Sequence, residues 1–130
     1  MSKGLLLDTH TLLWWLYEAE SLSGRSFDMI SDGSIDIYVS AVSAMEIATK
    51  HRSGRLPGAA GLVGNFVTSM EVEGFKPLAI TAAHGDLAGS FSGSHRDPWD
   101  RLLAAQAIID DVTLVSNDIK LREFGIEPFW

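Results

Sequence analysis

The sequence predicts a single α/β domain built on a mostly parallel sheet of four or five strands, with helices on both faces. The chain has 130 residues, enough for one hydrophobic core and one ordinary domain. Its composition, 46% hydrophobic and 21% charged, is typical of a globular protein. Short strand-like segments alternate with helical ones, which is the pattern of a parallel sheet covered by helices. We therefore expect residues 1–130 to form one domain with one site.

Four short apolar segments are predicted as strands. In chain order they are GLLLD at 4–8, IDIYVS at 35–40, FKPLAI at 75–80 and VTLVSN at 112–117. The closing segment IEPFW, at 126–130, could add a short edge strand. This segment decides between four and five strands.

The stretches between these strands have apolar residues at helical spacing. The predicted helices cover residues 9–20, 41–54, 61–74 and 97–111. Gly54, Gly74 and Gly125 stand where helices should end, because glycine readily adopts the left-handed backbone that closes many helices. Strands and helices thus alternate along the chain, with a final short helix before Gly125.

Composition excludes several classes of protein. Residues 4–17 are apolar, but Asp8 and His10 interrupt them, so neither a signal peptide nor a membrane span fits. We therefore expect a cytoplasmic protein with no membrane contact. The absence of cysteine excludes disulfides and thiolate metal sites, so any metal would be held by oxygen or imidazole. The net charge of −7 argues against a broad nucleic-acid-binding face, unless several acids bind cations, and it suits a basic partner.

Acidic residues stand at or near the ends of the predicted strands. Asp8 ends the first strand and Asp118 follows the fourth. Each has a structural alternative as a helix N-cap, with Asn117 as a second candidate for the cap of the short last helix. Ligands of open α/β sheets bind at the carboxyl ends of the strands, and this rule makes both acids candidates for a site.

Glu46 lies in the helix after the second strand. Ser43 and Glu46 match a capping box, and Glu46 with Lys50 forms a favourable pair four residues apart, so a purely structural role is a good alternative. Its significance depends on whether other acids lie beside it.

The stretch HRDPWDRLLAAQA, at 95–107, contains two aspartates for which the sequence predicts different roles. With Pro98 at the first helical position, Asp97 is the N-cap and can also reach Arg101. Asp100 instead heads the apolar stripe formed by Leu103, Ala104, Ala107 and Ile108. A carboxylate on a buried face is costly unless it is paired or bound to a cation. We therefore assign the cap to Asp97 and the chemistry to Asp100.

A parallel sheet would bring Asp8, Glu46, Asp100 and Asp118 to one edge. Clustered carboxylates repel one another unless cations neutralise them, and oxygen ligands suit Mg²⁺ or Mn²⁺. Such a centre can activate water and stabilise the leaving oxygen in phosphodiester hydrolysis. Whether one or two metal ions bind stays open.

Four blocks of the sequence together resemble the PIN-domain ribonucleases, most closely the VapC-type toxins of bacterial toxin–antitoxin pairs. The blocks are LLLDTHTLLWWL, YVSAVSAMEIATKHRSGRL, HRDPWDRLLAAQA and LVSNDIKLREFG, in matching order and spacing over nearly the whole chain. The resemblance implies a PIN-like fold and a Mg²⁺- or Mn²⁺-dependent endoribonuclease whose catalytic and metal-binding acids are Asp8, Glu46, Asp100 and Asp118. The last acid is the most variable in the family.

The resemblance also implies supporting residues and partners. Thr9 and Ser116 help to hold the site, and His95 and Asp97 are supporting or structural. The implied partners are the RNA substrate, a second copy in a homodimer, and a small VapB-like antitoxin that directs a basic side chain toward the acids. The apolar run at 14–17 exceeds what one face of a small helix needs, so either a partner covers part of it or both tryptophans belong to the core.

A basic cluster follows Glu46 along the predicted helix and its exit. Lys50, Arg52 and Arg55 are predicted to contact the RNA backbone, with Arg101 extending the surface. The alternative is a solvated helix end that complements the helix dipole.

Two other functions are consistent with part of the sequence. An Asp-based phosphotransfer domain would need a lysine after a late strand, for which Lys120 is the candidate, and would leave Glu46 and Asp100 unexplained. A PIN-like module that binds partners without catalysis would retain the fold alone. Neither the RNA target nor the antitoxin can be named from the sequence.

Overall fold

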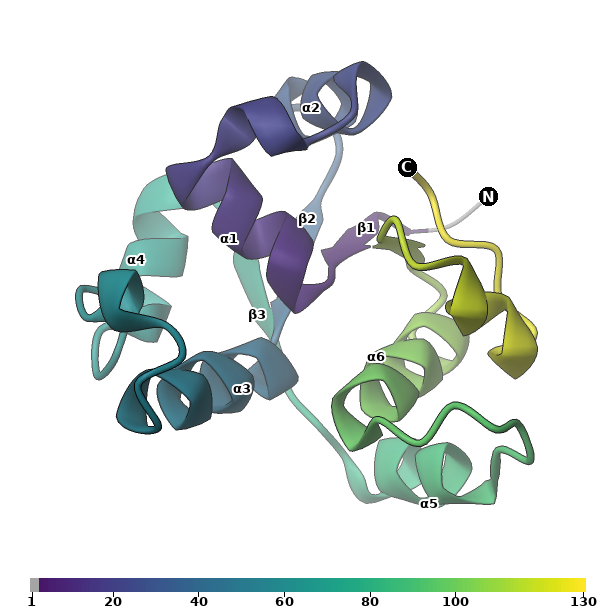
Figure 1. The fold of residues 1–130 in the computed structure, drawn as a ribbon. Coiled ribbons are helices and arrows are strands. Elements are labelled where there is room, and N and C mark those ends of the chain that lie inside the picture. Colours follow the sequence, from purple (N-terminus) through teal and green to yellow (C-terminus); the bar gives the residue numbers. More distant parts are fainter. Residues whose placement is uncertain (1–2) are drawn as a thin grey trace.

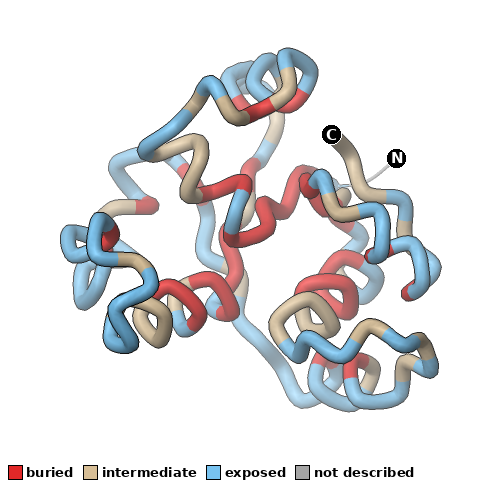
Figure 2. The backbone as a smooth tube through the Cα atoms, viewed as in Figure 1, coloured by how far each residue is buried: buried red, intermediate tan, exposed pale blue. Residues whose placement is uncertain are grey.

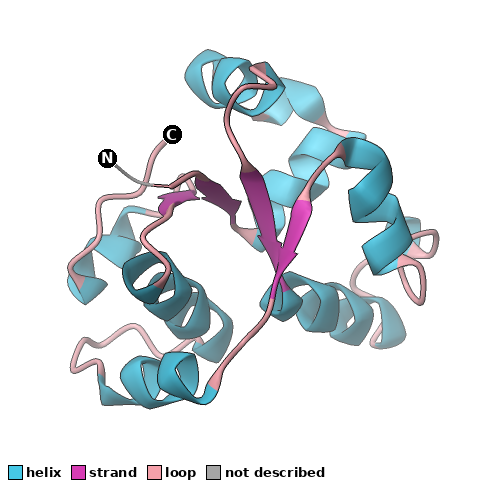
Figure 3. Ribbon diagram, turned by 180° about the vertical axis from the view of Figure 1, so that it is seen from behind, coloured by secondary structure: helices cyan, strands magenta, loops and turns pink. Residues whose placement is uncertain are grey.

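The computed structural model describes residues 3–130, and in this range four strands form one parallel sheet. The strands are β1 (Leu5–Leu7), β2 (Ile37–Ser40), β3 (Lys76–Leu78) and β4 (Thr113–Val115). Their order is β3-β2-β1-β4, so the first strand lies inside the sheet and pairs with both β2 and β4 (Figures 1 and 3). The predicted α/β class and all four predicted strands are confirmed.

Six α-helices lie in the described range. They are α1 (Thr9–Tyr17), α2 (Gly24–Ser31), α3 (Ala41–Arg52), α4 (Phe66–Glu73), α5 (Ala82–Ser90) and α6 (Pro98–Ile109). Short 3-10 helices occupy Ala19–Ser21, Pro57–Ala59 and Ile119–Phe124. The helices predicted at 9–20, 41–54 and 97–111 are present, and the one predicted at 61–74 begins only at Phe66.

Two helices, α2 and α5, were not predicted. α5 has the sequence AAHGDLAGS, whose two glycines and few large apolar residues give little intrinsic helix propensity. Tertiary packing supplies the missing stability, because α5 lies along α6 with Ala88 and His84 buried between them. The Nε2 atom of His84 is 2.7 Å from a carboxylate oxygen of Asp110, which joins the two helices.

The C-terminal segment adds less than a strand. Phe129 forms an isolated parallel bridge with Val115, and its N–H and C=O bond to Leu114 and Ser116. Residues 126–130 therefore run beside β4 without extending the sheet to a full fifth strand.

The hydrophobic core has two parts, one on each face of the sheet. Successive side chains of a strand point to opposite faces, so Leu5 and Leu7 pack on one side and Leu6 on the other. The first side is covered by α1, α2 and α4, and the second by α6 and the last 3-10 helix, with α3 contributing to both. Figure 2 shows the buried chain following the strands and the inner turns of the helices.

Helix α6 packs its predicted stripe against the sheet, with one exception. Leu103, Ala104 and Ala107 are buried, but Ile108 is 44% exposed, contrary to the prediction. Gln106, outside the predicted stripe, is fully buried: its amide oxygen accepts from Ser40 Oγ at 2.6 Å, and its amide nitrogen donates to the carbonyls of Leu78, the last residue of β3, and Ala79. This amide ties α6 to the carboxyl edge of the sheet.

None of the helices in residues 3–130 is both long enough and apolar enough to cross a membrane.

Candidate metal centre at the carboxyl edge of the sheet

A pocket of about 250 Å³ opens where the strands end. It is lined by Asp8, Thr9, His10, Glu46, Lys50, His95, Asp97, Asp100, Asn117 and Asp118. The four acids predicted to be catalytic thus lie in one place, although they come from four different elements. Their convergence follows from the parallel sheet, which directs β1, β2 and β4 to the same edge.

Asp8 is both a helix cap and a wall of the pocket. One carboxylate oxygen accepts from the Thr11 N–H at 2.8 Å, which caps α1, and the side chain also bonds with the Ser116 hydroxyl. Only 7% of the residue is exposed, and burial raises the pKa of Asp8 above its usual value despite these hydrogen bonds. The hydrogen bonds of the cap therefore do not fully offset the cost of burying the ionised carboxylate.

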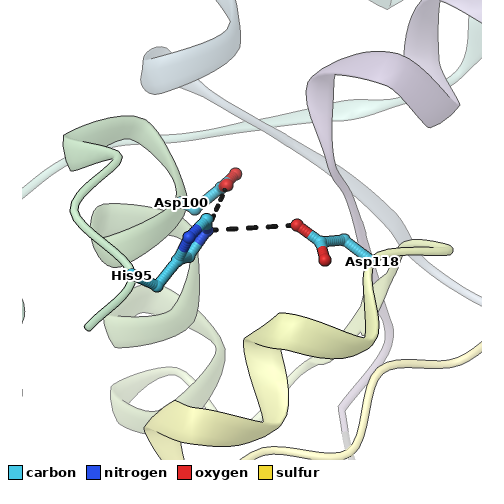
Figure 4. A group of neighbouring side chains, drawn as sticks. All are labelled: His95, Asp100 and Asp118. Atoms are coloured by element: carbon cyan, nitrogen blue, oxygen red, sulfur yellow. Dashed lines mark hydrogen bonds and ion pairs between the residues drawn. The ribbon is translucent and has the colours of Figure 1, made fainter. Parts of the chain in front are cut away.

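Asp100 lies in the first turn of α6 and points into the pocket, as Figure 4 shows. Its Oδ2 is 2.7 Å from His95 Nε2. The pKa of Asp100 is raised to about 6: burial is the largest cause, the contact with His95 lowers the pKa, and the charges of Asp97 and Asp8 raise it. A carboxylate in this position would be stabilised by a cation.

Asp118, which follows β4, is the fourth of the predicted acids that line the pocket. It caps the last 3-10 helix by accepting from the Lys120 N–H at 3.0 Å, and its other oxygen lies 3.9 Å from His95 Nε2. The Ser116 hydroxyl accepts from the Asp118 N–H at 3.1 Å. Because Ser116 also bonds to Asp8, it contacts two of the four acids, and its supporting role stays a prediction.

Glu46 enters from α3 together with a cation. Its carboxylate is 2.6 Å from Lys50 Nζ, so the predicted pair is present, and Glu46 itself is buried. The predicted capping box is wrong, because α3 begins three residues earlier and Ser40 caps it. Ser43 instead shares a 2.9 Å hydrogen bond with Thr9, which joins α3 to α1 below the pocket.

Asp97 is the N-cap of α6, as predicted, and the chemistry assigned to Asp100 stays a prediction. Asp97 is exposed and accepts from the Trp99 N–H at 2.9 Å, so it caps α6. It also borders the pocket, where its charge acts on Asp100. The predicted contact between Asp97 and Arg101 does not form, because the guanidinium of Arg101 points to the loop before the helix.

Arg101 is a brace for that loop. Its three nitrogens donate to the carbonyl oxygens of Ala88, Phe91, Gly93 and His95 over 2.7 to 3.1 Å. These donors are used within the protein, and the predicted contact of Arg101 with RNA stays a prediction.

The other predicted basic residues differ in position. Lys50 lines the acidic pocket itself, whereas Arg52 and Arg55 are exposed at the end of α3 and just beyond it. Arg55 donates to Ser53 at 2.9 Å, which leaves its charge at the surface. Of the three, only Lys50 lines the acidic pocket, and Arg55 lines a separate, mainly apolar groove.

His95 is the residue that the sequence prediction undervalued. The resemblance assigned it a supporting role, but its ring lies against two of the four acids (Figure 4). The signal available in the sequence was its position five residues before Asp100, in a loop whose conformation could not be predicted.

The donor set suits a divalent cation. Carboxylate oxygens are hard ligands of the kind that Mg²⁺ and Mn²⁺ prefer, and five carboxylate side chains line this one small pocket. The raised pKa values of Asp8 and Asp100 show that their charges are poorly compensated by the protein alone. A bound cation would supply this compensation.

Comparisons with known proteins agree with this arrangement. A sequence model of the PIN domain matches residues 5–127. Ribonuclease VapC22 from Mycobacterium tuberculosis (strain ATCC 25618 / H37Rv) is 31% identical over 121 residues, which cover 91% of this chain and 89% of that protein.

Solved structures share the fold. VapBC2 from Rickettsia felis, bound to a DNA fragment from its promoter, has a TM-score of 0.68 at 15% identity, covering 97% of this chain and 96% of that chain. FitAcB from Neisseria gonorrhoeae has a TM-score of 0.61 at 17% identity, with coverages of 97% and 96%.

Proposed function

Because this chain belongs to the PIN-domain family, we propose that it is a metal-dependent endoribonuclease of the VapC type, held inactive by a cognate antitoxin. The relative named Ribonuclease VapC22 supports the activity, and the two structures of VapBC and FitAcB support the fold. The observation that carries the proposal is the convergence of five carboxylates, including the four predicted to be catalytic, and one lysine in a single pocket.

Mg²⁺ or Mn²⁺ is the proposed cofactor, held by Asp8, Glu46, Asp100 and Asp118. When bound, such an ion activates water and stabilises negative charge on the phosphate oxygens during hydrolysis. Thr9, Ser116 and Asp97 keep the acids in place through the bonds described above. The chain thus supplies a preorganised acidic frame.

Lys50 is the residue proposed to bind the scissile phosphate. Glu46 holds its ammonium group at the mouth of the pocket, 2.6 Å away, so the charge is oriented before substrate arrives. A pocket of about 250 Å³ is small for a drug-sized ligand and suits a phosphodiester group with its ion. Arg52 and Arg55 would then contact neighbouring phosphates along the strand.

The phosphotransfer alternative fits less well. Lys120 is exposed and is absent from the pocket lining, whereas that chemistry needs a lysine beside the acceptor aspartate. It would also leave Glu46 and Asp100 without a role.

An apolar groove next to the pocket supports the proposed antitoxin. The groove has a volume of about 390 Å³, and it is lined by residues including Leu13, Trp14, Tyr17 and Leu56. His10 borders both the groove and the acidic pocket, so one bound segment can reach from apolar contacts to the acids. Its basic side chain would compete with the metal for the carboxylates. A homodimer remains part of the proposal.

Cleavage of a mixed cellular RNA pool tests the proposal directly. Purified wild type, Asp100→Asn and Asp97→Asn are compared with Mg²⁺ or Mn²⁺, and again with chelator. We expect discrete products that require metal, a loss of roughly 100-fold or more for Asp100→Asn, and a change below roughly 10-fold for Asp97→Asn, which keeps the cap. Metal-independent cleavage would contradict the proposed metal dependence, and no cleavage by the wild type would favour a partner-binding module without catalysis.

A further inference from the structure

His95 places a nitrogen donor between two of the carboxylates. Its Nε2 is 2.7 Å from Oδ2 of Asp100 and 3.9 Å from Oδ2 of Asp118, and donor atoms of the three residues all lie within 4.8 Å of one another (Figure 4). An octahedral ion with ligands about 2.1 Å away holds adjacent donors about 3 Å apart and opposite donors about 4.2 Å apart. The 2.7 Å and 3.9 Å separations each lie about 0.3 Å from one of these two values, so a small adjustment of the side chains brings the three residues to the spacing of one shared ion.

The ring of His95 is held in place before any ion binds. It packs on Phe124, with ring centroids 5.7 Å apart, and Arg101 Nε donates to the His95 carbonyl at 2.9 Å. Glu123 accepts from the hydroxyl of Ser94 at 3.0 Å and fixes the preceding residue. Because packing and backbone contacts already fix this side chain, it is preorganised to bind an ion.

Building on the proposed metal-dependent nuclease, we propose that Nε2 of His95 is a direct ligand of the ion held by Asp100 and Asp118, and that it makes the centre prefer Mn²⁺ to Mg²⁺. Mg²⁺ strongly favours oxygen ligands, whereas transition-metal ions also accept imidazole nitrogen. In the metal-bound protein the ring proton resides on Nδ1, and coordination replaces the hydrogen bond between Nε2 and Asp100.

Pulsed electron paramagnetic resonance of bound Mn²⁺ tests the proposal without relying on activity. One equivalent of Mn²⁺ is added to wild type, His95→Gln and His10→Gln, and nitrogen modulation is recorded. His10 is the matched control, because it is a second histidine on the same pocket wall. Wild-type protein labelled with ¹⁵N-histidine gives the same information without a substitution, so the result does not depend on whether a variant folds.

We expect ¹⁴N modulation in wild type and in His10→Gln, its conversion to a ¹⁵N signal in the labelled protein, and its loss in His95→Gln. We also expect His95→Gln to weaken Mn²⁺ binding by about 10-fold or more, and Mg²⁺ binding by less than about 3-fold, in calorimetric titrations. Bound Mn²⁺ without nitrogen modulation, or modulation that survives in His95→Gln, would reduce His95 to a hydrogen-bond partner of Asp100.

RNA cleavage by the same samples separates the two proposals. Metal-dependent cleavage without nitrogen modulation would overturn the ligand assignment and leave the nuclease intact. Nitrogen modulation without cleavage would support the ligand assignment and count against the nuclease. Failure of Mn²⁺ to bind at all would overturn the ligand assignment.

Discussion

Asp97 and Asp100 lie three positions apart at the start of α6 and differ in their surroundings. Asp97 is exposed to solvent, and one of its carboxylate oxygens accepts a hydrogen bond from the Trp99 N–H. Asp100 begins the buried face of α6. There, burial and the negative charges of Asp97 and Asp8 all disfavour its ionised form. The helical repeat therefore places Asp100 on the buried face of α6, while both residues border the pocket.

The raised pKa of Asp100 makes the stability of the metal-free protein depend on pH. The folded value is about 6 and the reference value 3.8, so between them the native state binds more protons than the unfolded state. The contribution of this group to stability is therefore present below about pH 4 and is lost as pH rises through 6. Asp100→Asn should be more stable than wild type at pH 7, by roughly 1–3 kcal/mol, with the gap closing toward pH 4.

Urea unfolding in chelator at pH 4, 5, 6 and 7 measures this gap. Asp28→Asn, at an exposed position of α2 outside the pocket, reports the general effect of removing one negative charge. A stability difference that stays constant over the pH range for Asp100→Asn would contradict the assigned pKa.

Arg101 and Lys50 provide a matched pair for separating a loop brace from an RNA contact. Arg101→Gln removes four hydrogen bonds to the loop and should lower the free energy of unfolding by roughly 1–3 kcal/mol. It should leave the salt dependence of RNA binding unchanged, whereas Lys50→Gln should lower that slope by about 0.7. Binding titrations at several salt concentrations measure both, and a smaller slope for Arg101→Gln would restore it as an RNA contact.

At the scale of the element, the N-terminus of α6 combines a cap, a fixed first turn and a reactive side chain. Pro98 suits the first helical position because its missing N–H would have no helical partner there. Asp97 satisfies the N–H of Trp99. The cap therefore fixes where the helix starts and, with it, the direction in which Asp100 points.

Loss of this cap should cost stability in a way that distinguishes two substitutions. Asp97→Ala removes the acceptor for the Trp99 N–H and should lower the free energy of unfolding by about 1 kcal/mol, whereas Asp97→Asn keeps a capping oxygen and should cost less. Thermal and urea unfolding of the two variants provide the comparison. Equal losses would mean that the charge of Asp97, rather than its cap, stabilises α6.

At the scale of the molecule, the acidic centre exists only when the chain is folded. Asp8 follows β1, Glu46 lies in α3, Asp100 lies in α6 and Asp118 follows β4, and the parallel sheet brings these elements together. An ion that binds this constellation binds the native state far better than the unfolded chain. Metal binding and folding are therefore coupled.

This coupling predicts a stabilisation by metal that depends on the pocket. At a Mn²⁺ concentration 100 times its dissociation constant, the wild type should gain about 2.7 kcal/mol of unfolding free energy relative to chelated protein. Asp100→Asn should gain much less at the same concentration, and Asp97→Asn nearly as much as wild type. Thermal unfolding with and without Mn²⁺ measures the effect, and equal gains in all three proteins would place the ion elsewhere.

Local patterns in the sequence were enough to predict the alternating strands, most helices and the division between Asp97 and Asp100. Each of these depends on spacing along one segment, because periodicities of two and 3.6 residues are local properties of the backbone. The four acids could be selected because a parallel sheet sends its strand ends to one edge.

The tertiary structure decided what local spacing cannot encode. α5 forms because α6 buries one side of it. The N-cap of α3 is Ser40 rather than Ser43, and Ser40 is held by a hydrogen bond to Gln106 of α6. Arg101 points to the loop before α6 because backbone carbonyls accept its hydrogen bonds. His95 points into the acidic pocket, where its ring packs on Phe124. Such partners lie far apart in the chain, and packing alone brings them within hydrogen-bonding distance.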